Sequence, residues 1–444
     1  MTRVALSGWG RFPVTSCRLE TPADLAGLRA LLPQGRLAPR GNGRGYGDCA
    51  LLEDGLTASM LRMNCMLHFD AATGQLVAQA GVLLADIIDA FLPRGWFPAV
   101  TPGTKFVTVG GMIAADVHGK NHHQSGAFGR HVLWLDLLLP NGEVVRCSRD
   151  ERAELFEYTC GGMGLTGVIL RACLQLMPVR TGWIRQETRV AMNLQQAMDA
   201  FEASGQWTYS VAWIDCLARG AAMGRSLLFL GEHALPEELP QAWRHAPLRT
   251  PARRKWHVPV DVPAALMNRM SMGAFNELYF RAGQRGNASR LVDWDSYFYP
   301  LDAVGAWNRV YGARGFAQYQ CVIPREAARG GMAALLAAVS AHGSGSFLAV
   351  LKLLGQQDSR FSFPMDGYTL ALDFPVNPHT LALLDSLDRI TADHGGRVYL
   401  AKDARMSRTL FEQTEPRADA YRRYRSSAML DRHFASAQSE RLGL

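Results

Sequence analysis

The chain has 444 residues, of which 48% are hydrophobic and 20% charged, and its formal net charge is +7 at pH 7. This composition excludes a largely disordered chain, and the length favours two folded domains over a single core.

Cysteine usage and apolar content indicate a cytoplasmic protein. The eight cysteines form no Cys-x-x-Cys pair, which favours reduced thiols. The N-terminus lacks the apolar stretch of a secretory signal. The apolar run that begins at Met332 stops after about ten residues, too short to span a bilayer.

From residue 35 to about 180, short β-like runs alternate with glycine-rich turns. A strand is expected at 75–82 and an amphipathic helix at 84–95, where Pro and Gly end it. Asn141-Gly142 predicts a type I′ turn in a hairpin over 131–147. Ser148 and Glu151 have the capping-box spacing of a helix start, and a strand is expected at 168–176. These elements predict an α+β domain.

From about 181 to 396 the pattern changes to longer helices between isolated strands. This alternation predicts a separate domain with an antiparallel sheet covered by helices. The expected helices are 194–204, 332–342 and 379–395, and the expected strands are 209–216, 319–324, 348–354 and 368–376.

The segment 247–259 carries Arg249, Arg253, Arg254 and Lys255 and no acid. It is either a solvated loop or a contact for a phosphate group or an anionic membrane surface. No basic strand carries the interleaved aromatic residues that bind single-stranded nucleic acid, so no nucleic-acid partner is expected.

Residues 162–167, "GMGLTG", match the G-x-G-x-x-G pattern, with Glu187 at a plausible distance for a ribose-binding acid. A Rossmann site needs a strand before the glycines and a helix after them. The expected order here is the reverse, which argues against a nicotinamide cofactor.

Three glycine-rich segments within about 130 residues are the stronger signal: 40–48, 101–111 and 161–167. Backbone N–H groups in such loops hold the diphosphate of a dinucleotide at close approach. Three such loops beside β-like runs predict an extended cofactor such as FAD.

The segments "RGNGRGYGD", "TPGTKFVTVGGMIAADVHGKNHHQSGAFG", "GGMGLTGVI" and "GGRVYLAKDAR" with "FASAQSERL" resemble the decaprenylphosphoryl-ribose 2-oxidase family over essentially the whole chain. That family belongs to the vanillyl-alcohol-oxidase/PCMH type of FAD flavoproteins. The resemblance implies a two-domain α+β fold, with an FAD domain built from 1–180 and a returning segment 397–444, and a substrate domain at 181–396.

The resemblance also implies the reaction. FAD would oxidise the 2-hydroxyl of a polyprenyl-phosphate-linked ribofuranose, the first half of an epimerisation to arabinofuranose. An NAD(P)H-dependent reductase would be the pathway partner, and the protein would sit peripherally at the inner membrane face. Arg44 stands where covalent members of the superfamily commonly carry His, which implies noncovalent FAD.

The residues that the resemblance places along FAD come mostly from the glycine loops and the C-terminal segment. They are Gly43, Arg44, Gly45, Tyr46, Gly47, Gly103, Thr104, Val107, Gly110, Gly111, Ala115, Val117, His118, Gly164, Ile169, Tyr399, Ala401 and Lys402.

The run "HGKNHH" at 118–123 suggests a metal site, a catalytic cluster or a bland loop. By resemblance His118 and Lys120 line the pocket, while His122 and His123 orient the loop. No carboxylate or cysteine stands at a suitable spacing, so no metal is expected.

Lys402 is the predicted catalytic cation, because a fixed positive charge near flavin N1 stabilises the reduced ring. No residue stands out as the general base. His118 ranks first, and Lys120, Tyr46 and Tyr299 are further candidates for a proton relay.

The substrate contacts implied by the resemblance are Trp213, Tyr299, Gln318, Gln320, Lys352, Thr369 and Lys120. Three positions depart from the family: Ala371 replaces an active-site cysteine, and Met163 and Thr369 replace asparagines. These changes leave the exact sugar open. Two other functions remain open, an FAD oxidase of soluble sugars, alditols or aldonolactones, and a flavin-binding protein without turnover.

Overall fold

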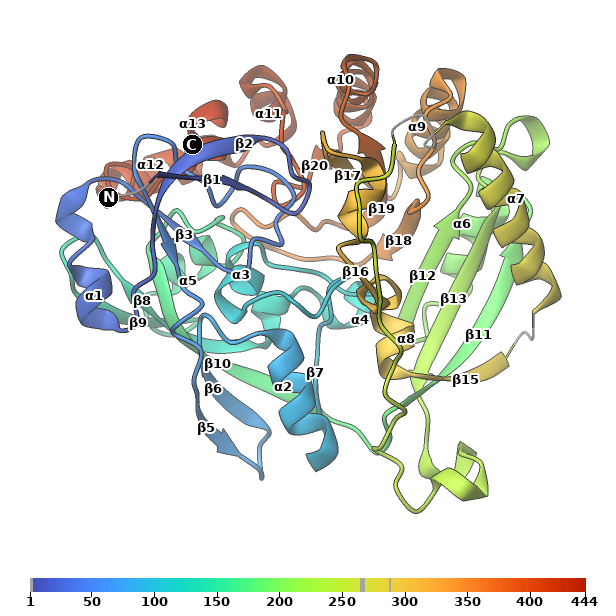
Figure 1. The fold of residues 1–444 in the computed structure, drawn as a ribbon, viewed down its shortest axis with the longest axis horizontal. Helices are drawn as coiled ribbons and strands as arrows, with labels where there is room; N and C mark the ends of the chain where they lie inside the picture. Colours follow the sequence, from blue (N-terminus) through green and yellow to red (C-terminus); the bar gives the residue numbers. More distant parts are fainter. Residues whose placement is uncertain (1–2, 264–267, 287–288) are drawn as a thin grey trace.

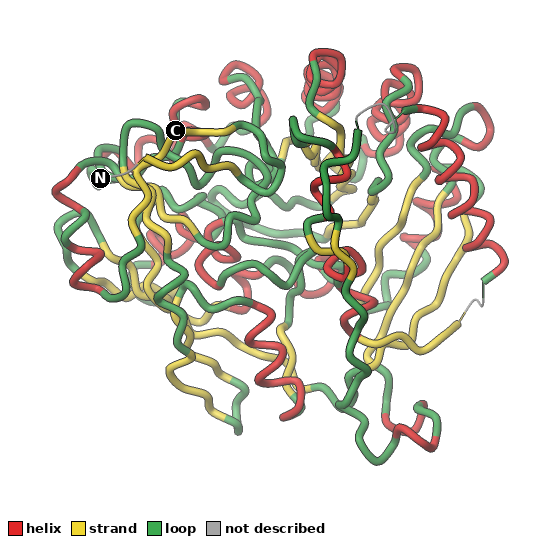
Figure 2. The backbone as a smooth tube through the Cα atoms, in the orientation of Figure 1, coloured by secondary structure: helices red, strands yellow, loops and turns green. Residues whose placement is uncertain are grey.

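The computed structural model describes residues 3–263, 268–286 and 289–444. Two smaller sheets are formed by the first part of the chain and one eight-stranded sheet by most of the rest (Figure 1). Loops fill the middle of the molecule between the sheets, as Figure 2 shows.

The first sheet has four strands in the order β1-β2-β4-β3. β1 and β2 pair antiparallel, whereas β4 pairs parallel with both β2 and β3. Its elements are β1 (Arg3–Ser7), β2 (Val14–Glu20), α1 (Leu25–Arg29), β3 (Leu37–Arg40) and β4 (Leu56–Ser59).

The second sheet is antiparallel, in the order β5-β6-β10-β8-β9, and β7 pairs with β10. The strands are β5 (Met66–Asp70), β6 (Gln75–Gln79), β7 (Trp96–Pro98), β8 (Val132–Leu138), β9 (Val144–Ser148) and β10 (Val168–Pro178). The helices are α2 (Leu84–Phe91), α3 (Val109–Ala114), α4 (His122–Ser125) and α5 (Ala153–Thr159).

The third sheet is antiparallel throughout, in the order β15-β11-β13-β12-β18-β19-β17-β20. The strands are β11 (Trp183–Ala191), β12 (Tyr209–Ile214), β13 (Ser226–His233), β15 (Ser289–Asp293), β17 (Phe316–Pro324), β18 (Val350–Leu354), β19 (Gly367–Pro375) and β20 (Arg397–Val398). The helices between them are α6 (Leu194–Glu202), α7 (Arg269–Arg285), α8 (Trp294–Phe298), α9 (Ala328–His342) and α10 (Pro378–Asp393). A short parallel pair, β14 (Trp256–His257) and β16 (Val304–Gly305), lies apart.

Local sequence explains where the long helices begin and end. The side chain of Asn377 accepts from the Thr380 N–H, and Pro378 occupies the first position of α10, where no N–H is needed. Gly343 ends α9 with a φ of 79°. The buried face of α9, with Met332, Leu335 and Val339, packs into the core of the eight-stranded sheet. Each such side chain contributes about 1.5–3 kcal/mol by burial.

The chain returns to the first sheet at its C-terminus, through α11 (Arg408–Thr414), α12 (Ala418–Ser427) and α13 (Ala437–Leu442). The Leu37 N–H donates to the His433 carbonyl, and Leu37 bridges to Phe434. Figure 1 shows these helices beside β1 and β2.

The α+β class and the helix-covered antiparallel sheet are confirmed, whereas two local predictions are wrong. In the hairpin, Gly142 has a positive φ of 81° but Asn141 does not, because Pro140 and Asn141 form the centre of the turn and proline fixes a negative φ. Ser148 does accept from the Glu151 N–H at 3.0 Å, but this turn precedes the helix, since Arg152 has a φ of 48° and α5 begins at Ala153.

Candidate active site

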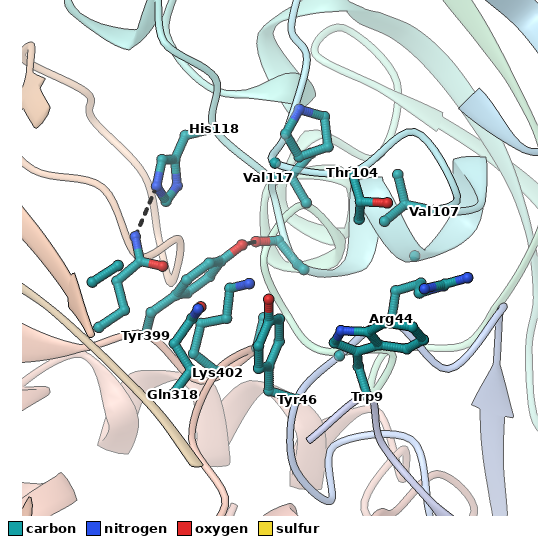
Figure 3. A pocket seen from close by; sticks show the side chains of 18 of the residues that line it. Trp9, Arg44, Tyr46, Thr104, Val107, Val117, His118, Gln318, Tyr399 and Lys402 are labelled. Carbon is teal, nitrogen blue, oxygen red and sulfur yellow. Dashed lines mark hydrogen bonds between the residues drawn. The ribbon is translucent and has the colours of Figure 1, made fainter. Parts of the chain in front are cut away.

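A cavity of about 610 Å³ lies where the glycine loops of the first part of the chain face the eight-stranded sheet. It is lined by parts of 39–50, 101–120 and 163–169, by the facing strands and by residues 399–402. Figure 3 shows Trp9, Arg44 and Thr104 at one end, and His118, Gln318 and Tyr399 at the other.

The first glycine loop presents free donors to this cavity. Within the described ranges, the backbone N–H groups of residues 42–45 donate to no protein acceptor. Gly43 has a φ of 62°, and a Cβ on Gly41 would lie 2.2 Å from Thr108 Oγ1. Successive free N–H groups in a loop without side chains form an anion site. The loop therefore fits the diphosphate of FAD.

The second glycine segment is fixed by Asp302. One carboxylate oxygen of Asp302 accepts from the Lys105 N–H at 2.9 Å and from Thr104 Oγ1 at 3.1 Å. Thr108 then caps α3 by accepting from the Gly111 N–H. Gly103 lies open, since a Cβ there would meet no protein atom within 4 Å. The arrangement leaves space beside the backbone for a cofactor.

Strand register builds the opposite wall. Gln318 pairs with Asp373 and Gln320 with Ala371, while Lys352 on β18 pairs with Thr369. Side chains two residues apart share one face of a strand. This alternation directs Gln318, Gln320, Lys352 and Asp373 to the cavity.

The three histidines of the 118–123 run have different partners. His122 Nε2 lies 2.9 Å from Gln357 Oε1, and its Nδ1 accepts from the Gly355 N–H. His123 Nε2 lies 2.8 Å from the Trp207 carbonyl. These contacts tie the loop to the other half of the molecule, whereas His118 lines the cavity.

His118 is held between the sheet and an aromatic group. Its Nε2 lies 3.0 Å from Gln320 Nε2, its ring lies 5.4 Å from that of Tyr399, and its Nδ1 is buried with no partner in the described part of the chain (Figure 3). Burial, with the cations Lys352 and Lys402, lowers the pKa of His118 well below its usual value. His118 is therefore neutral at neutral pH.

Three half-buried lysines line the cavity. Burial and the neighbouring charge of Lys352 lower the pKa of Lys120 to about 7, and burial alone lowers that of Lys352 to about 8. The Lys402 ammonium lies 3.7 Å from the centre of the Tyr46 ring. Burial also lowers the pKa of Lys402, against the attraction of Asp373. Anionic ligands would restore the charged forms.

One end of the cavity is aromatic and reaches the surface. Trp213 lies 4.8 Å from Tyr279, and Phe275 lies 5.0 Å from Phe347, measured between ring centres. All four line the cavity, yet Phe275 and Tyr279 are each 39% exposed. This end suits an apolar chain that extends out of the protein.

The structure brings most of the sequence-predicted residues to this one cavity. They are Gly43, Arg44, Gly45, Tyr46, Gly103, Thr104, Val107, Gly110, Gly111, Ala115, Val117, His118, Lys120, Gly164, Ile169, Trp213, Gln318, Gln320, Lys352, Tyr399, Ala401 and Lys402.

Three predicted residues do not line it. Gly47 packs against the C-terminal segment, where an added Cβ would lie 2.0 Å from the Asp403 carbonyl oxygen. Tyr299 is fully buried beside Trp294, which corrects its assignment as a substrate contact. Thr369 accepts from Gln320 Nε2 at 3.2 Å and so helps to orient that amide.

The sequence reading missed Trp9, Asp302, Asp373 and the aromatic residues of α7. Arg44 stacks on Trp9 at 4.0 Å, a contact across 35 residues that no motif signals. Asp373 does carry a local signal, because it is an acid within the apolar run "YTLALDFPV".

Two arginines of the basic segment 247–259 make contacts within the protein, so the segment is not simply a solvated loop. The Arg253 guanidinium donates to the carbonyl oxygens of Asp295, Tyr299 and Pro300. Arg254 stacks on Trp256, which is 60% exposed, and Val260 beyond it is 63% exposed. Among the residues that the structure describes, none of the helices combines the length and the apolar composition of a membrane span.

Comparison with known proteins agrees with this geometry. A family profile described as an FAD binding domain matches residues 18–148. The chain is 36% identical to decaprenylphosphoryl-beta-D-ribose oxidase of Mycolicibacterium smegmatis over 455 aligned residues, which cover 100% of this chain and 98% of the relative. It is 36% identical to an uncharacterized protein in the mprA 5′ region of Streptomyces coelicolor, over 82% of this chain and 100% of that protein. L-gulonolactone oxidase of Bos taurus matches at 32% over 37% of this chain and 36% of its own length.

The glycine loops fit FAD, and the match to the ribose oxidase spans both chains almost completely. The chain therefore belongs to the decaprenylphosphoryl-β-D-ribose oxidase family and is an FAD-dependent oxidoreductase.

Proposed function

We propose that this protein oxidises the 2-hydroxyl of a polyprenyl-phosphate-linked ribofuranose to the 2-keto sugar. The observation that carries the proposal is the presence of lysines of lowered pKa and an aromatic outlet in one cavity. A ribosyl-phosphoryl-prenol has a sugar, an anionic phosphate and an apolar chain, which match the glutamines, the lysines and the aromatic side chains of the cavity.

Different residues of the cavity would bind the phosphate, the sugar and the prenyl chain of this substrate. Lys352 and Lys120, which lie close enough for the charge of Lys352 to lower the pKa of Lys120, would hold the phosphate. Gln318 and Gln320 would hold sugar hydroxyls from the strand face. Phe275 and Tyr279 would receive the first isoprene units.

FAD, held by the 42–45 loop, would supply the two-electron oxidation of the carbinol. Lys402 would place its charge beside the flavin ring, with Tyr46 beneath its ammonium. The cofactor would be noncovalent, because Arg44 stands at the position of the His that covalent members use. FAD released into the supernatant after acid precipitation would support this, and FAD retained in the pellet would contradict it.

The product ketone would need reduction from the opposite face to become arabinofuranose. A separate NAD(P)H-dependent reductase would therefore be the pathway partner. Arg254, Lys255 and the exposed Trp256 would meet the anionic membrane that holds the lipid substrate. The variant R254Q/K255Q should bind anionic vesicles more weakly than wild type, and equal binding would contradict that role.

The reaction is tested with matched sugars under anaerobic conditions. Farnesylphosphoryl-ribose should reduce the bound flavin, whereas its 2-deoxy analogue should not. Product analysis should give the 2-keto sugar. Equal reduction by free ribose 5-phosphate and by the farnesyl compound would favour the alternative, an oxidase of soluble sugars.

A further inference from the structure

Asp373 is an acid on the cavity face of β19, a strand whose other residues are uncharged. The two-residue alternation of β19 places it on the same side as Ala371, and its side chain is fully buried. A buried acid is rare unless a partner or a function retains it.

The carboxylate is only half satisfied. Asp373 Oδ1 accepts from Gln318 Nε2 at 2.6 Å, and the backbone N–H of Asp373 donates to Ser346 Oγ at 2.9 Å. Asp373 Oδ2 is buried and makes no hydrogen bond of normal geometry in the ranges that the structure describes; the Tyr311 hydroxyl, also without such a bond, lies near enough to lower the pKa of Asp373. An acceptor oxygen in a ligand cavity, held rigidly through its partner oxygen, is suited to meet a ligand hydroxyl.

The groups around Asp373 come from three other segments. Lys402 follows β20, Tyr311 precedes β17, and Tyr46 belongs to the first glycine loop; these residues interact electrostatically with Asp373. Burial raises the pKa of Asp373, while the Gln318 hydrogen bond, the Lys402 charge and the Tyr311 hydroxyl oppose that rise. A carboxylate with a raised pKa is a better base at neutral pH than an ordinary one.

Two other candidate bases, His118 and Lys120, are occupied. With Gln320 Nε2 donating to His118 Nε2, the His118 ring proton resides on Nδ1, so the ring offers no lone pair to the cavity. The Lys120 ammonium donates to the Tyr297 carbonyl. This geometry argues against the sequence-based ranking of His118 as the first candidate base.

We propose that Asp373 Oδ2 accepts the hydroxyl proton of the alcohol substrate, an inference that rests on the alcohol oxidation proposed above. The O–H bond breaks and its proton passes to Asp373, which becomes a carboxylic acid. The carbinol C–H bond breaks, a second C–O bond forms, and the hydride leaves with its electron pair to the oxidant of this family, FAD. The sugar is oxidised and FAD is reduced by two electrons.

The test measures anaerobic flavin reduction by farnesylphosphoryl-ribose in wild type, in Asp373→Asn and in the control Asp366→Asn. Asp366 lies just before β19, is half-exposed and pairs with Arg325 outside the cavity. Asparagine keeps an acceptor for Gln318 but cannot take a proton. D373N should reduce flavin roughly 10²–10⁴-fold more slowly than wild type and should lose the acidic limb of the pH profile. The substrate dissociation constant should stay within about threefold, a tolerance of about 0.7 kcal/mol.

A second variant separates chemistry from folding. Asp373→Ala leaves space in which added formate can act as the base, so formate should restore much of its flavin reduction. The FAD dissociation constants of the three variants, measured on the apoproteins by flavin fluorescence, should match that of wild type.

The outcomes distinguish the two proposals. Two results would overturn the role of Asp373 alone, provided that the ribosyl lipid reduces the wild-type flavin. One is an unchanged rate and pH profile of flavin reduction in D373N, and the other is a D373A variant whose flavin reduction formate does not restore. A wild-type flavin that the ribosyl lipid does not reduce would overturn the alcohol oxidation, and this inference with it.

Discussion

Lys352 is the residue that most directly links the cavity to a phosphate-bearing substrate. Its side chain is half-buried at the wall of the cavity and forms no ion pair in the described part of the chain. Lys352→Met should raise KM for farnesylphosphoryl-ribose roughly 30-fold or more, since losing one partner of a buried charge pair costs about 2–5 kcal/mol. An alkyl riboside without phosphate is the control, and its KM should not change. An equal KM effect on both substrates would contradict the assignment of Lys352 to the phosphate.

The lowered pKa of Lys352 also makes the stability of the folded apoprotein depend on pH. The unfolded chain keeps this amine protonated up to its usual pKa of 10.5, whereas the folded apoprotein releases the proton at about 8. Between these values the unfolded state binds more protons, so this group makes the fold more stable as pH rises.

K352M should therefore be more stable than wild type at neutral pH, by up to roughly 3 kcal/mol. The difference should shrink as pH approaches 10.5. Urea denaturation of the two apoproteins across this range measures it, and a difference that grows with pH would contradict the sign.

At single positions, the sequence predicts residues that belong to local motifs. The glycine loops, the 118–123 run and Lys402 all reach the cavity because each lies in a contiguous segment with its own pattern. Tyr299 shows where local sequence stops being informative, because an aromatic residue near a predicted strand can belong either to the hydrophobic core or to a ligand site. Its burial depends on Trp294 and on the carbonyl contact with Arg253, which only the folded chain brings together.

At the scale of elements, the second glycine segment offers a direct test of the cofactor cradle. A Cβ on Gly103 meets no protein atom within 4 Å, so Gly103→Ala should leave apoprotein stability unchanged. If FAD fills that space, the methyl group should weaken FAD binding roughly tenfold, in line with steric costs of about 1–3 kcal/mol.

Gly273→Ala is the matched control for this substitution. Gly273 lies within α7, also without a neighbour within 4 Å of its added Cβ. This variant should gain about 0.5–1 kcal/mol of stability, because alanine favours a helix, and should bind FAD as wild type does. Unchanged FAD affinity in G103A would contradict the placement of FAD along the second loop.

Helices and strands with a clear apolar period could be predicted from the sequence, whereas the pairing of strands in the sheet could not. α9, α10 and β12 appear where the apolar pattern places them. The pairing of Gln318 with Asp373 depends on the register of β17 and β19, which are separated by more than 40 residues and a helix. That register, rather than local preference, directs Asp373 into the cavity.

At the scale of the whole molecule, Arg441 fastens the C-terminal segment to the first glycine loop. Its guanidinium binds Asp48 at 2.8 Å and Asp403 at 2.9 Å, and both carboxylates are buried. Arg441→Met would leave two buried acids unpaired and should cost about 3–5 kcal/mol of stability. It should also weaken FAD binding, because Asp403 directly follows Lys402, which lines the cavity.

The control for this variant is Arg408→Met. Arg408 forms an exposed pair with Glu412 four residues along a helix, and such a pair contributes about 0.3–0.5 kcal/mol. Thermal melts of both variants with and without FAD make the comparison. Similar losses in R441M and R408M would contradict the fastening role of Arg441.

An anaerobic absorbance spectrum shows whether FAD in this cavity oxidises a phosphate-linked prenyl sugar. The purified holoprotein is mixed anaerobically with farnesylphosphoryl-ribose, and the oxidised-flavin absorbance is followed. We expect the flavin to bleach in proportion to the substrate added. A flavin that stays oxidised in the presence of excess substrate would contradict the proposed reaction.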